Sequence, residues 1–306
     1  MKRRCFLFAA CGGLLPALAL AQTGGGAVPE APPVATPGNI LRFDLGPAEP
    51  PVPQARFGDQ WLVIARERNR WVALLGVDIA TVPGNYLLAV NHPTMDTLHF
   101  SVRARRDPVV PRSTAAARAL GAEALVEAQL QRIQQGMGKK PEGNARLPLW
   151  RPVSAPLIDR FGGRYVLADG SYRAVRHVTF DLTADTTVRA PTEGKVLGVT
   201  DLGQGRLVVL DHGQGLVSVL WPLHETKVRA GETPKQGAAV GVNLVAGGAR
   251  GEVNWALLMN RAWVHPMALV EEPAPAKPPP RETPPPRPAP ETPPARKPRA
   301  ASTSVR

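Results

Sequence analysis

Short apolar runs alternate with turn residues between about residue 40 and residue 105. The runs are Ile40–Phe43, Trp61–Ala65, Trp71–Val77, Tyr86–Val90 and Leu98–Val102. Runs of this length, rich in branched and aromatic residues and bounded by Pro, Gly and Asn, are typical of strands in a β-sandwich. The pattern predicts a β-sandwich-like N-terminal domain over residues 39–106. We expect His92 and His99, which fall within it, to be ordinary surface residues.

A stretch without proline follows, from Thr114 to Gln135, and is rich in Ala, Leu, Glu, Gln and Arg. Thr114, or the serine before it, can cap a helix there, and Gly136 can end it. The apolar face is modest and consists of Leu125, Leu130 and Ile133. We therefore expect a connecting helix within a linker at residues 107–149, docked against a neighbouring domain. A regulatory helix is the alternative interpretation.

The first residues have the layout of a cleavable secretory signal. Three basic residues at positions 2–4 precede an apolar run from Phe6 to Leu20, which ends in an Ala-Leu-Ala sequence. Residues 1–21 are therefore predicted to be a signal peptide that directs the protein to the periplasm. The apolar run is too short for a transmembrane helix, and no later stretch replaces it. A lipid anchor on Cys11 is the alternative.

Two proline-rich stretches have little apolar surface to bury. Residues 22–38 are rich in Gly, Pro and Ala, and we expect a disordered spacer. Residues 271–306 contain 13 prolines, seven basic and four acidic residues, which predicts a basic, disordered tail of polyproline type. The tail is interpreted as a spacer. Tracking an anionic polymer, or docking into an aromatic groove of a partner, are the alternatives.

Charge and cysteine content narrow the possible partners. The formal net charge is +12, and it becomes +9 when the three basic residues at positions 2–4 leave with the signal peptide. Export argues against nucleic acid as a partner, so anionic envelope polymers or membrane surfaces are the expected attractors. A basic surface without a specific partner is the alternative. Cys5 and Cys11 both lie in the signal peptide, which excludes disulfides and thiolate metal sites from the mature chain.

An ordered series of short motifs runs from residue 161 to residue 266. The series reads Phe161-Gly-Gly-Arg164, His177-Val-Thr-Phe-Asp181, Arg189-Ala-Pro-Thr-Glu-Gly194-Lys-Val196, Asp211-His-Gly-Gln-Gly215, Val228-Arg-Ala-Gly231 and His265-Pro266. It resembles the lysostaphin/LytM (M23-like, duplicated hybrid motif) family of peptidoglycan endopeptidases. The resemblance implies a LytM-like antiparallel β domain at residues 150–270. It also implies that residues 39–106 are the small β domain that precedes the catalytic domain in many proteobacterial members.

The resemblance further implies a zinc site. In this family the metal is held by the His and Asp of an HxxxD motif and by the second His of an HxH strand. The open fourth position holds the attacking water. His177 and Asp181 stand in the HxxxD spacing, with Thr179 where the family usually has Gly. His212 matches a structural histidine of the DHG hairpin and is not counted as catalytic.

The other catalytic histidines are replaced. Pro222 stands at the YxH position, and Glu252 and Asn254 stand at the two HxH positions. A neutral amide is a poor zinc ligand, so we expect no cofactor and interpret His177 and Asp181 as vestigial ligands that hydrogen-bond each other. The alternative is a zinc site that uses Glu252 as a substitute third ligand, since residues two apart on a strand share a face.

Aromatic residues and one further histidine are predicted to line the groove of this domain. They are Trp221, Trp255 and His224, with Trp263 nearby. His224 could replace the missing histidine if the strand continued past Pro222, but we expect the proline to end the strand. The tryptophans are either core residues or a platform for a ligand.

These observations favour a non-catalytic LytM-like cell-envelope protein. Such a protein would bind peptidoglycan or regulate a cell-wall hydrolase, for example as the activator of a periplasmic amidase. The alternative is a zinc metalloendopeptidase that cleaves peptidoglycan cross-links with rearranged ligands. In a third hypothesis the chain is a structural spacer whose Pro-rich tail is the functional part.

Overall fold

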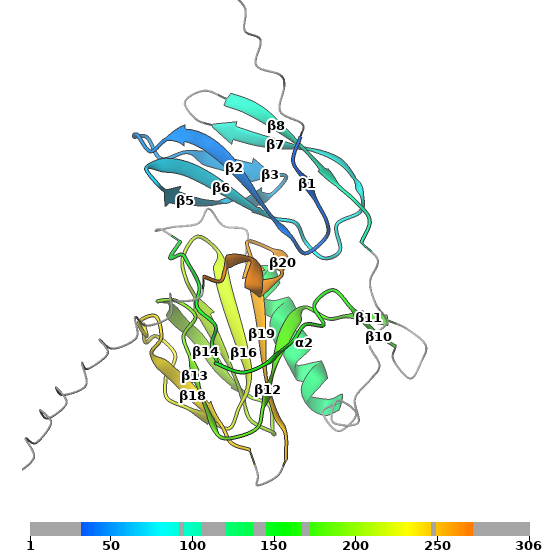
Figure 1. The fold of residues 1–306 in the computed structure, drawn as a ribbon, viewed down its shortest axis with the longest axis vertical. Coiled ribbons are helices and arrows are strands. Elements are labelled where there is room, and N and C mark those ends of the chain that lie inside the picture. The colour runs from blue at the N-terminus through cyan, green and yellow to red at the C-terminus, as the bar shows by residue number, and fades with distance from the viewer. Residues whose placement is uncertain are drawn as a thin grey trace, which may run out of the picture.

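The computed structural model describes residues 32–91, 95–105, 120–136, 145–166, 172–245 and 249–271. The predicted mainly β fold class is confirmed, because β-strands dominate both of the units that Figure 1 shows stacked along the long axis. The predicted signal peptide, His92 and almost all of the Pro-rich tail lie outside the described residues. No helix within these residues is long and apolar enough to cross a membrane.

The N-terminal unit is built from two sheets that share a core. One has the strand order β1-β8-β7-β3-β4 and the other the order β2-β6-β5. The strands are β1 (Val34–Ala35), β2 (Ile40–Pro47), β3 (Gln54–Phe57), β4 (Gln60–Trp61), β5 (Val63–Glu67), β6 (Arg70–Gly76), β7 (Gly84–Asn91) and β8 (Met95–Val102). Phe43 and Leu75 of one sheet and Phe100 of the other belong to one buried cluster. The unit is therefore sandwich-like.

The folded part of this unit begins earlier than the sequence predicted. β1 pairs in parallel with β8, and Ala35 is buried. The amide of Gly38 then donates to the carbonyl of Val77 at 2.8 Å. The expectation of a disordered spacer up to residue 38 is thus wrong from residue 32 onward. The reason is that β8 offers an edge whose backbone groups pair with those of this segment.

The C-terminal unit contains a seven-stranded sheet. Its path is β14-β15-β16-β19-β12-β9, and β20 also pairs with β19. These strands are β9 (Leu157–Ile158), β12 (His177–Leu182), β14 (Lys195–Asp201), β15 (Arg206–Asp211), β16 (Leu216–Leu223), β19 (Gly251–Met259) and β20 (Ala262–Val264). Smaller elements are β10 (Arg164–Val166) with β11 (Tyr172–Ala174), the sheet of β13 (Thr186–Arg189), β18 (Ala239–Asn243) and β17 (Glu225–Thr226), and the 3₁₀ helix η1 (Pro266–Leu269). Phe180, Leu220 and Trp255 lie in the core of this unit.

Strands β5 and β6 are buried on both faces over residues 63–65 and 73–76. Ile64 and Leu75 point into the N-terminal core, whereas Val63 and Leu74 belong to the core of the C-terminal unit. Double burial explains why this part of the sequence shows unbroken apolar runs rather than alternation. A side chain on Gly76 would come within 2.9 Å of a methyl group of Val264, so the two units approach each other closely at this glycine.

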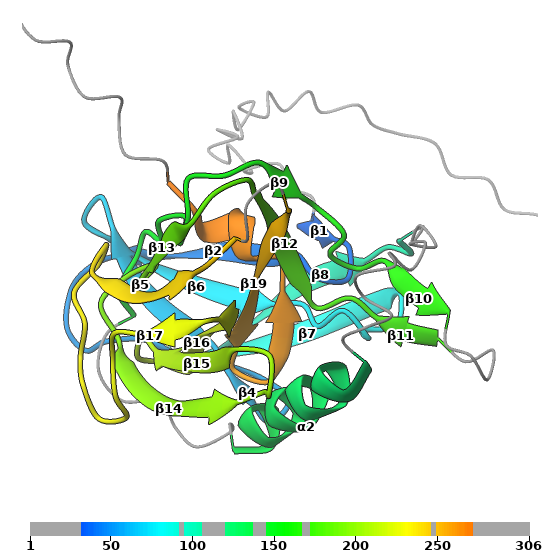
Figure 2. The same ribbon diagram turned by 90° about the horizontal axis from the view of Figure 1, so that it is seen from below.

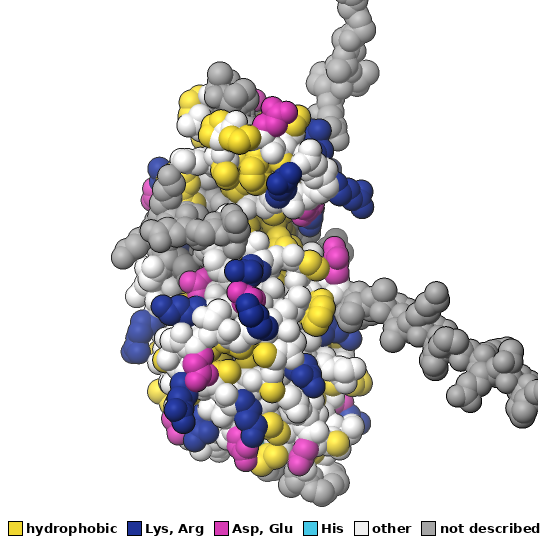
Figure 3. Space-filling model, turned by 90° about the vertical axis from the view of Figure 1, so that its left-hand side faces the viewer, with side chains coloured by type: hydrophobic (Ala, Val, Ile, Leu, Met, Phe, Trp, Pro, Cys, Tyr) yellow, Lys and Arg dark blue, Asp and Glu magenta, His cyan; other side chains and the backbone are white. Residues whose placement is uncertain are grey.

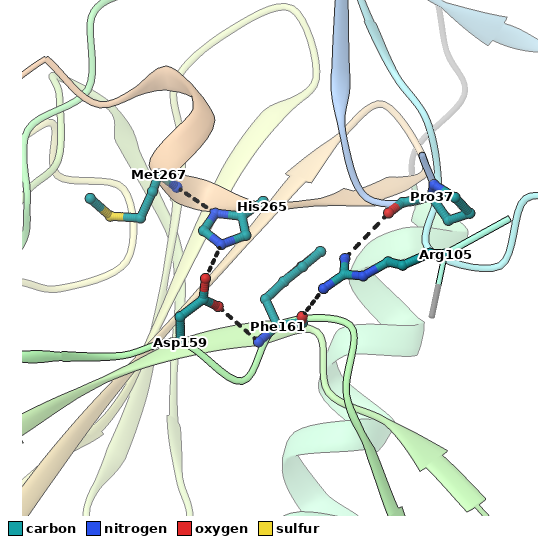
Figure 4. Close-up of polar contacts among 6 residues, drawn as sticks. All are labelled: Pro37, Arg105, Asp159, Phe161, His265 and Met267. Carbon is teal, nitrogen blue, oxygen red and sulfur yellow. Dashed lines mark hydrogen bonds and ion pairs between the residues drawn. The ribbon is translucent and has the colours of Figure 1, made fainter. Parts of the chain in front are cut away.

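A polar contact joins the two units at the other side of their interface, as Figure 4 shows. The Arg105 guanidinium donates to the carbonyl of Phe161 and, at 3.4 Å, to that of Pro37. The amide of His265 donates to the carbonyl of Gly38 at 2.8 Å. Gly38 has a φ of 89°, and a Cβ there would lie 2.4 Å from the Phe161 ring. The first motif of the C-terminal series is therefore a docking element for the N-terminal unit.

Helix α2 (Leu120–Gly136) packs on the outer face of the seven-stranded sheet, the face turned away from the C-terminal core. Figure 2 shows it alongside that sheet. Val126 and Leu130 are buried against the sheet, and Glu127 forms a 2.5 Å ion pair with Arg176. Leu125, predicted to belong to the apolar face, is exposed, because the buried stripe runs through Val126 instead. Residues 106–119, where the helix was expected to begin, are not described.

We predict that Leu74→Ala destabilises the whole protein. Leu74 is fully buried between the two units, so the cavity and lost burial should lower the free energy of unfolding by about 2–5 kcal/mol. Urea denaturation monitored by tryptophan fluorescence measures this change. Leu87→Ala is the matched control, since Leu87 is 57% exposed and should change stability by less than about 0.5 kcal/mol. Equal effects of the two substitutions would contradict the proposed interface.

Candidate functional site

The outer face of β12 collects the residues that the motifs singled out. β12 pairs antiparallel with β19 so that Thr179 lies opposite Asn254 and Asp181 opposite Glu252. Side chains alternate along a strand, and the even-numbered residues of β12 are buried in the core. His177, Thr179 and Asp181 consequently share the outer face with Glu252 and Asn254. The register thus brings together the two retained ligand positions and the two replaced HxH positions.

A hydrogen bond occupies the centre of this group. Asn254 lies opposite Thr179, midway between His177 and Asp181, where β19 would have to supply a third metal ligand. The Thr179 hydroxyl donates to the side-chain oxygen of Asn254 at 2.8 Å, and Thr179 is buried. A glycine at position 179 would leave this space open. The threonine and the asparagine together fill it.

The remaining carboxylates do not complete a metal site. Asp181 forms an ion pair with Arg250, and Glu252 makes no side-chain hydrogen bond or ion pair with another described residue. Among the described residues, no three His, Cys, Asp or Glu side chains are grouped so that they could hold a metal ion. The structure therefore does not bring His177, Asp181 and Glu252 together as ligands. The donor set does not fit a catalytic zinc, which needs three protein ligands.

His177 lies against an aromatic wall and is uncharged near neutral pH. Its ring is 5.0 Å from that of Trp221, edge to face, and the side chain is half-buried. Burial, and then the positive charge of Arg160, lower the pKa of His177 to about 4. The expected hydrogen bond between His177 and Asp181 does not form, because the two lie four residues apart on the strand and Arg250 holds Asp181.

The predicted groove aromatics divide between the two faces of the sheet. Trp221 lies opposite Asn254 and belongs to the outer-face cluster, together with Trp263. Trp255 is completely buried on the core face, so its prediction as a groove residue is wrong. The physical reason is the alternation of β19, which turns Trp255 away from the face that Asn254 occupies.

Pro222 and His224 also differ from expectation. Strand β16 continues through Pro222 to Leu223, with a register shift in its pairing to β15, so the proline does not end the strand. His224 is exposed, and its Nδ1 accepts a hydrogen bond from the amide of Leu244, at 3.0 Å. It is thereby tied to the end of the neighbouring small sheet and does not replace the missing histidine beside His177.

His212 belongs to a buried network on the core face. Its Nδ1 is 3.2 Å from the carbonyl of Glu193, which can only accept, so Nδ1 carries the proton. Its Nε2, 2.9 Å from the Ser218 hydroxyl, then accepts from it, and the same hydroxyl accepts from the Trp255 indole at 3.0 Å. Burial lowers the pKa of His212 to about 4. The network has a structural role and does not reach the outer face.

Neutral burial of His212 predicts acid destabilisation. In the unfolded chain a histidine titrates near pH 6.5, whereas folded His212 titrates near 4, so the unfolded state binds more protons between these values. Stability contributed by this group is present above pH 6.5 and is lost as pH falls toward 4. Between pH 7 and 5 the loss from His212 should be about 2 kcal/mol. Urea denaturation at both pH values should show a smaller pH difference for His212→Gln than for the natural protein. An unchanged difference would contradict the assignment.

Two arginines at this site were missed by the sequence analysis. Arg250 immediately precedes β19 and pairs with Asp181, and Arg160 immediately precedes the Phe161-Gly-Gly-Arg164 motif. Neither stands at a position that the family resemblance marks as functional. β9 pairs with β12 so that Ile158 lies beside Thr179. Arg160 can be placed near His177 only from this pairing, which the sequence does not reveal.

Comparison with protein families identifies this domain. The model described as Peptidase family M23 matches residues 175–266, which contain every element of the outer-face site except β9 and Arg160. Residues 175–266 are a peptidase family M23 domain of LytM type. The M23 domain accounts for β12 to β20, and the predicted resemblance is confirmed.

Several solved structures are similar to this chain. A crystal structure from Pseudomonas aeruginosa assigned to peptidase M23 is 27% identical and has a TM-score of 0.58, covering 77% of this chain and 94% of that one. Lysostaphin is 21% identical, with a TM-score of 0.26, and the match covers 31% of this chain and 39% of that one. The SpoIIQ-SpoIIIAH pore-forming complex contains a chain that is 19% identical, with a TM-score of 0.33 and coverages of 43% and 93%. Comparison with curated proteins found no match.

We predict that three substitutions restore metal binding to the M23 domain. Thr179→Gly opens the central space, Asn254→His supplies the imidazole, and Arg250→Ala releases Asp181 from its ion pair. After dialysis against zinc and then zinc-free buffer, the triple variant should retain about one zinc per chain. The natural protein, and a control with Asn254→Gln in place of Asn254→His, should retain none. One zinc per chain in the natural protein would overturn our account of the site.

Proposed function

We propose that this chain is a non-catalytic LytM-like protein of the cell envelope that binds peptidoglycan or regulates a cell-wall hydrolase. The observation that carries the proposal is the hydrogen bond between Thr179 and Asn254, which engages the residue that stands where active M23 domains have their third metal ligand. Asp181 is also engaged, by Arg250. Without a metal-bound water the face has no activated nucleophile, whereas its capacity to bind a peptide is retained.

The chemistry of the face suits binding. Asn254, Glu252 and His177 are only half-buried and present polar atoms, and the His177 ring lies against Trp221, whose own side chain is buried. A small number of polar groups beside an aromatic wall is the usual composition of a ligand site. The M23 domain supplies the expected ligand class, the peptides of peptidoglycan. Regulation of a hydrolase rests on analogy with other degenerate LytM domains.

The surface charge supports an envelope partner more than a nucleic acid. On the face in Figure 3, Lys and Arg side chains are interspersed with Asp and Glu instead of forming one basic patch. Ion pairs among the described residues also mix the two signs, since Glu193 contacts both Arg146 and Lys235, at 3.0 and 2.7 Å. A strongly positive stripe, the usual footprint of nucleic-acid binding, is not seen on this face. We also propose that a cleavable signal peptide directs the protein to the periplasm.

A single experiment tests the proposal. Purified mature protein is incubated with peptidoglycan sacculi, alone and together with a periplasmic amidase, while bound zinc is measured. We expect the protein to sediment with the sacculi or to increase digestion by the amidase, and to release no peptide fragments by itself. Release of fragments by the protein alone, abolished by a chelator, would instead establish a metalloendopeptidase.

A further inference from the structure

Arg160 extends the outer-face site beyond the M23 motifs. β9 pairs antiparallel with β12 so that Ile158 lies beside Thr179, and the same register continued by two residues places Arg160 beside His177. Residues that face each other across an antiparallel pair lie on the same side of a sheet. The effect of the Arg160 charge on the pKa of His177 agrees with this placement. One end of the outer face therefore carries a guanidinium next to the imidazole of His177.

Within the described part of the chain, Arg160 differs from two neighbouring arginines in having no counter-ion. Arg176 pairs with Glu127 and Arg250 pairs with Asp181. Arg160 is half-buried, yet it makes no hydrogen bond or ion pair with another described residue. No Arg160 nitrogen is among the buried side-chain atoms that lack a partner, so the guanidinium reaches solvent and can donate two hydrogen bonds to a planar anion.

The backbone on both sides of Arg160 is held in place, as Figure 4 shows. The Asp159 carboxylate accepts from the amide of Phe161 at 3.1 Å and lies 2.9 Å from the His265 ring. The carbonyl of Phe161 accepts from Arg105 of the N-terminal unit, and the Phe161 ring is buried. The short segment that carries Arg160 is thus fixed by contacts with both units, which reduces the entropy lost when its side chain binds a ligand.

The surroundings of Arg160 favour a carboxylate. Asp181 lies four residues beyond His177 on β12, roughly 13 Å along the strand, and Glu252 faces it on β19. This separation exceeds the screening length of about 8 Å at physiological ionic strength. Asp159 is turned to His265. One guanidinium beside the half-buried ring of His177 suits a singly charged group better than a multiply charged phosphate.

We propose that the outer face of the M23 domain binds a peptide with a free C-terminal carboxylate, which Arg160 recognises, while the peptide chain extends along β12 and β19 toward Asn254. The inference rests on the proposed function, because the peptide stems of peptidoglycan carry such carboxylates. To the proposed function it adds the residue that recognises the ligand, Arg160, and the direction in which the peptide lies on the sheet. In this arrangement Arg160 provides the positive charge at a site whose metal position is filled by Thr179.

The test uses two synthetic probes and the full mature chain. The probes are diacetylated Lys-D-Ala-D-Ala with a free carboxylate and the same peptide as its C-terminal amide, and affinities are measured by titration calorimetry or NMR. We expect the acid to bind at least tenfold more tightly than the amide. Arg160→Gln should weaken binding of the acid to the level of the amide, while Arg160→Lys should recover part of the loss. Arg229→Gln removes an equal charge from an exposed loop and should change neither affinity.

Two outcomes would overturn the inference: equal affinities for acid and amide, or unchanged acid binding by Arg160→Gln. Sedimentation with sacculi shows whether such a result refutes only the role of Arg160 or also the proposed function. If sacculi retain the natural protein and Arg160→Gln equally, peptidoglycan binding stands and the role of Arg160 is refuted. If sacculi retain neither protein and the amidase is unaffected, while the acid probe still binds through Arg160, the carboxylate site stands and the proposed function is refuted.

Discussion

The pairing register between β12 and β19 is the constraint on which the site depends. Both strands are buried on one face and carry polar residues on the other, so a slip of one residue would exchange the two faces. Phe180 and Trp255, each completely buried, hold the register by packing on the core side. On the opposite side the same register sets Thr179 against Asn254. Core packing therefore determines which residues meet at the outer face.

At that face, interactions between side chains take the place that a metal would occupy. A metal ion would join β12 to β19 through three strong bonds, whereas here a neutral hydrogen bond and the ion pair of Asp181 with Arg250 connect the same positions. Each such contact contributes about 1 kcal/mol in net terms, so the fold is stabilised mainly by its core. The connection between β12 and β19 at this face therefore does not depend on a metal ion.

The N-terminal unit also supports the site. Its Ile79 packs against the outer-face cluster that contains Trp221 and Trp263, and Leu74 and Val63 complete the core of the M23 domain. Arg105 fixes the carbonyl of Phe161, next to Arg160. The two units are thus one cooperative structure at this contact, and a change in their docking would alter the position of Arg160.

Local patterning of the sequence established the mainly β class, and the order of its motifs established the M23 resemblance. That resemblance implied that His177, Asp181 and Asn254 meet at one site. The tertiary structure decided that Trp255 lies in the core, that His224 is tied to a different sheet and that Arg160 and Arg250 border the site. Alternation indicates which residues of a strand lie together. Alternation does not indicate which face of the sheet is covered by the core, or which side chains from distant loops reach the opposite face. Both depend on how segments remote in sequence pack together.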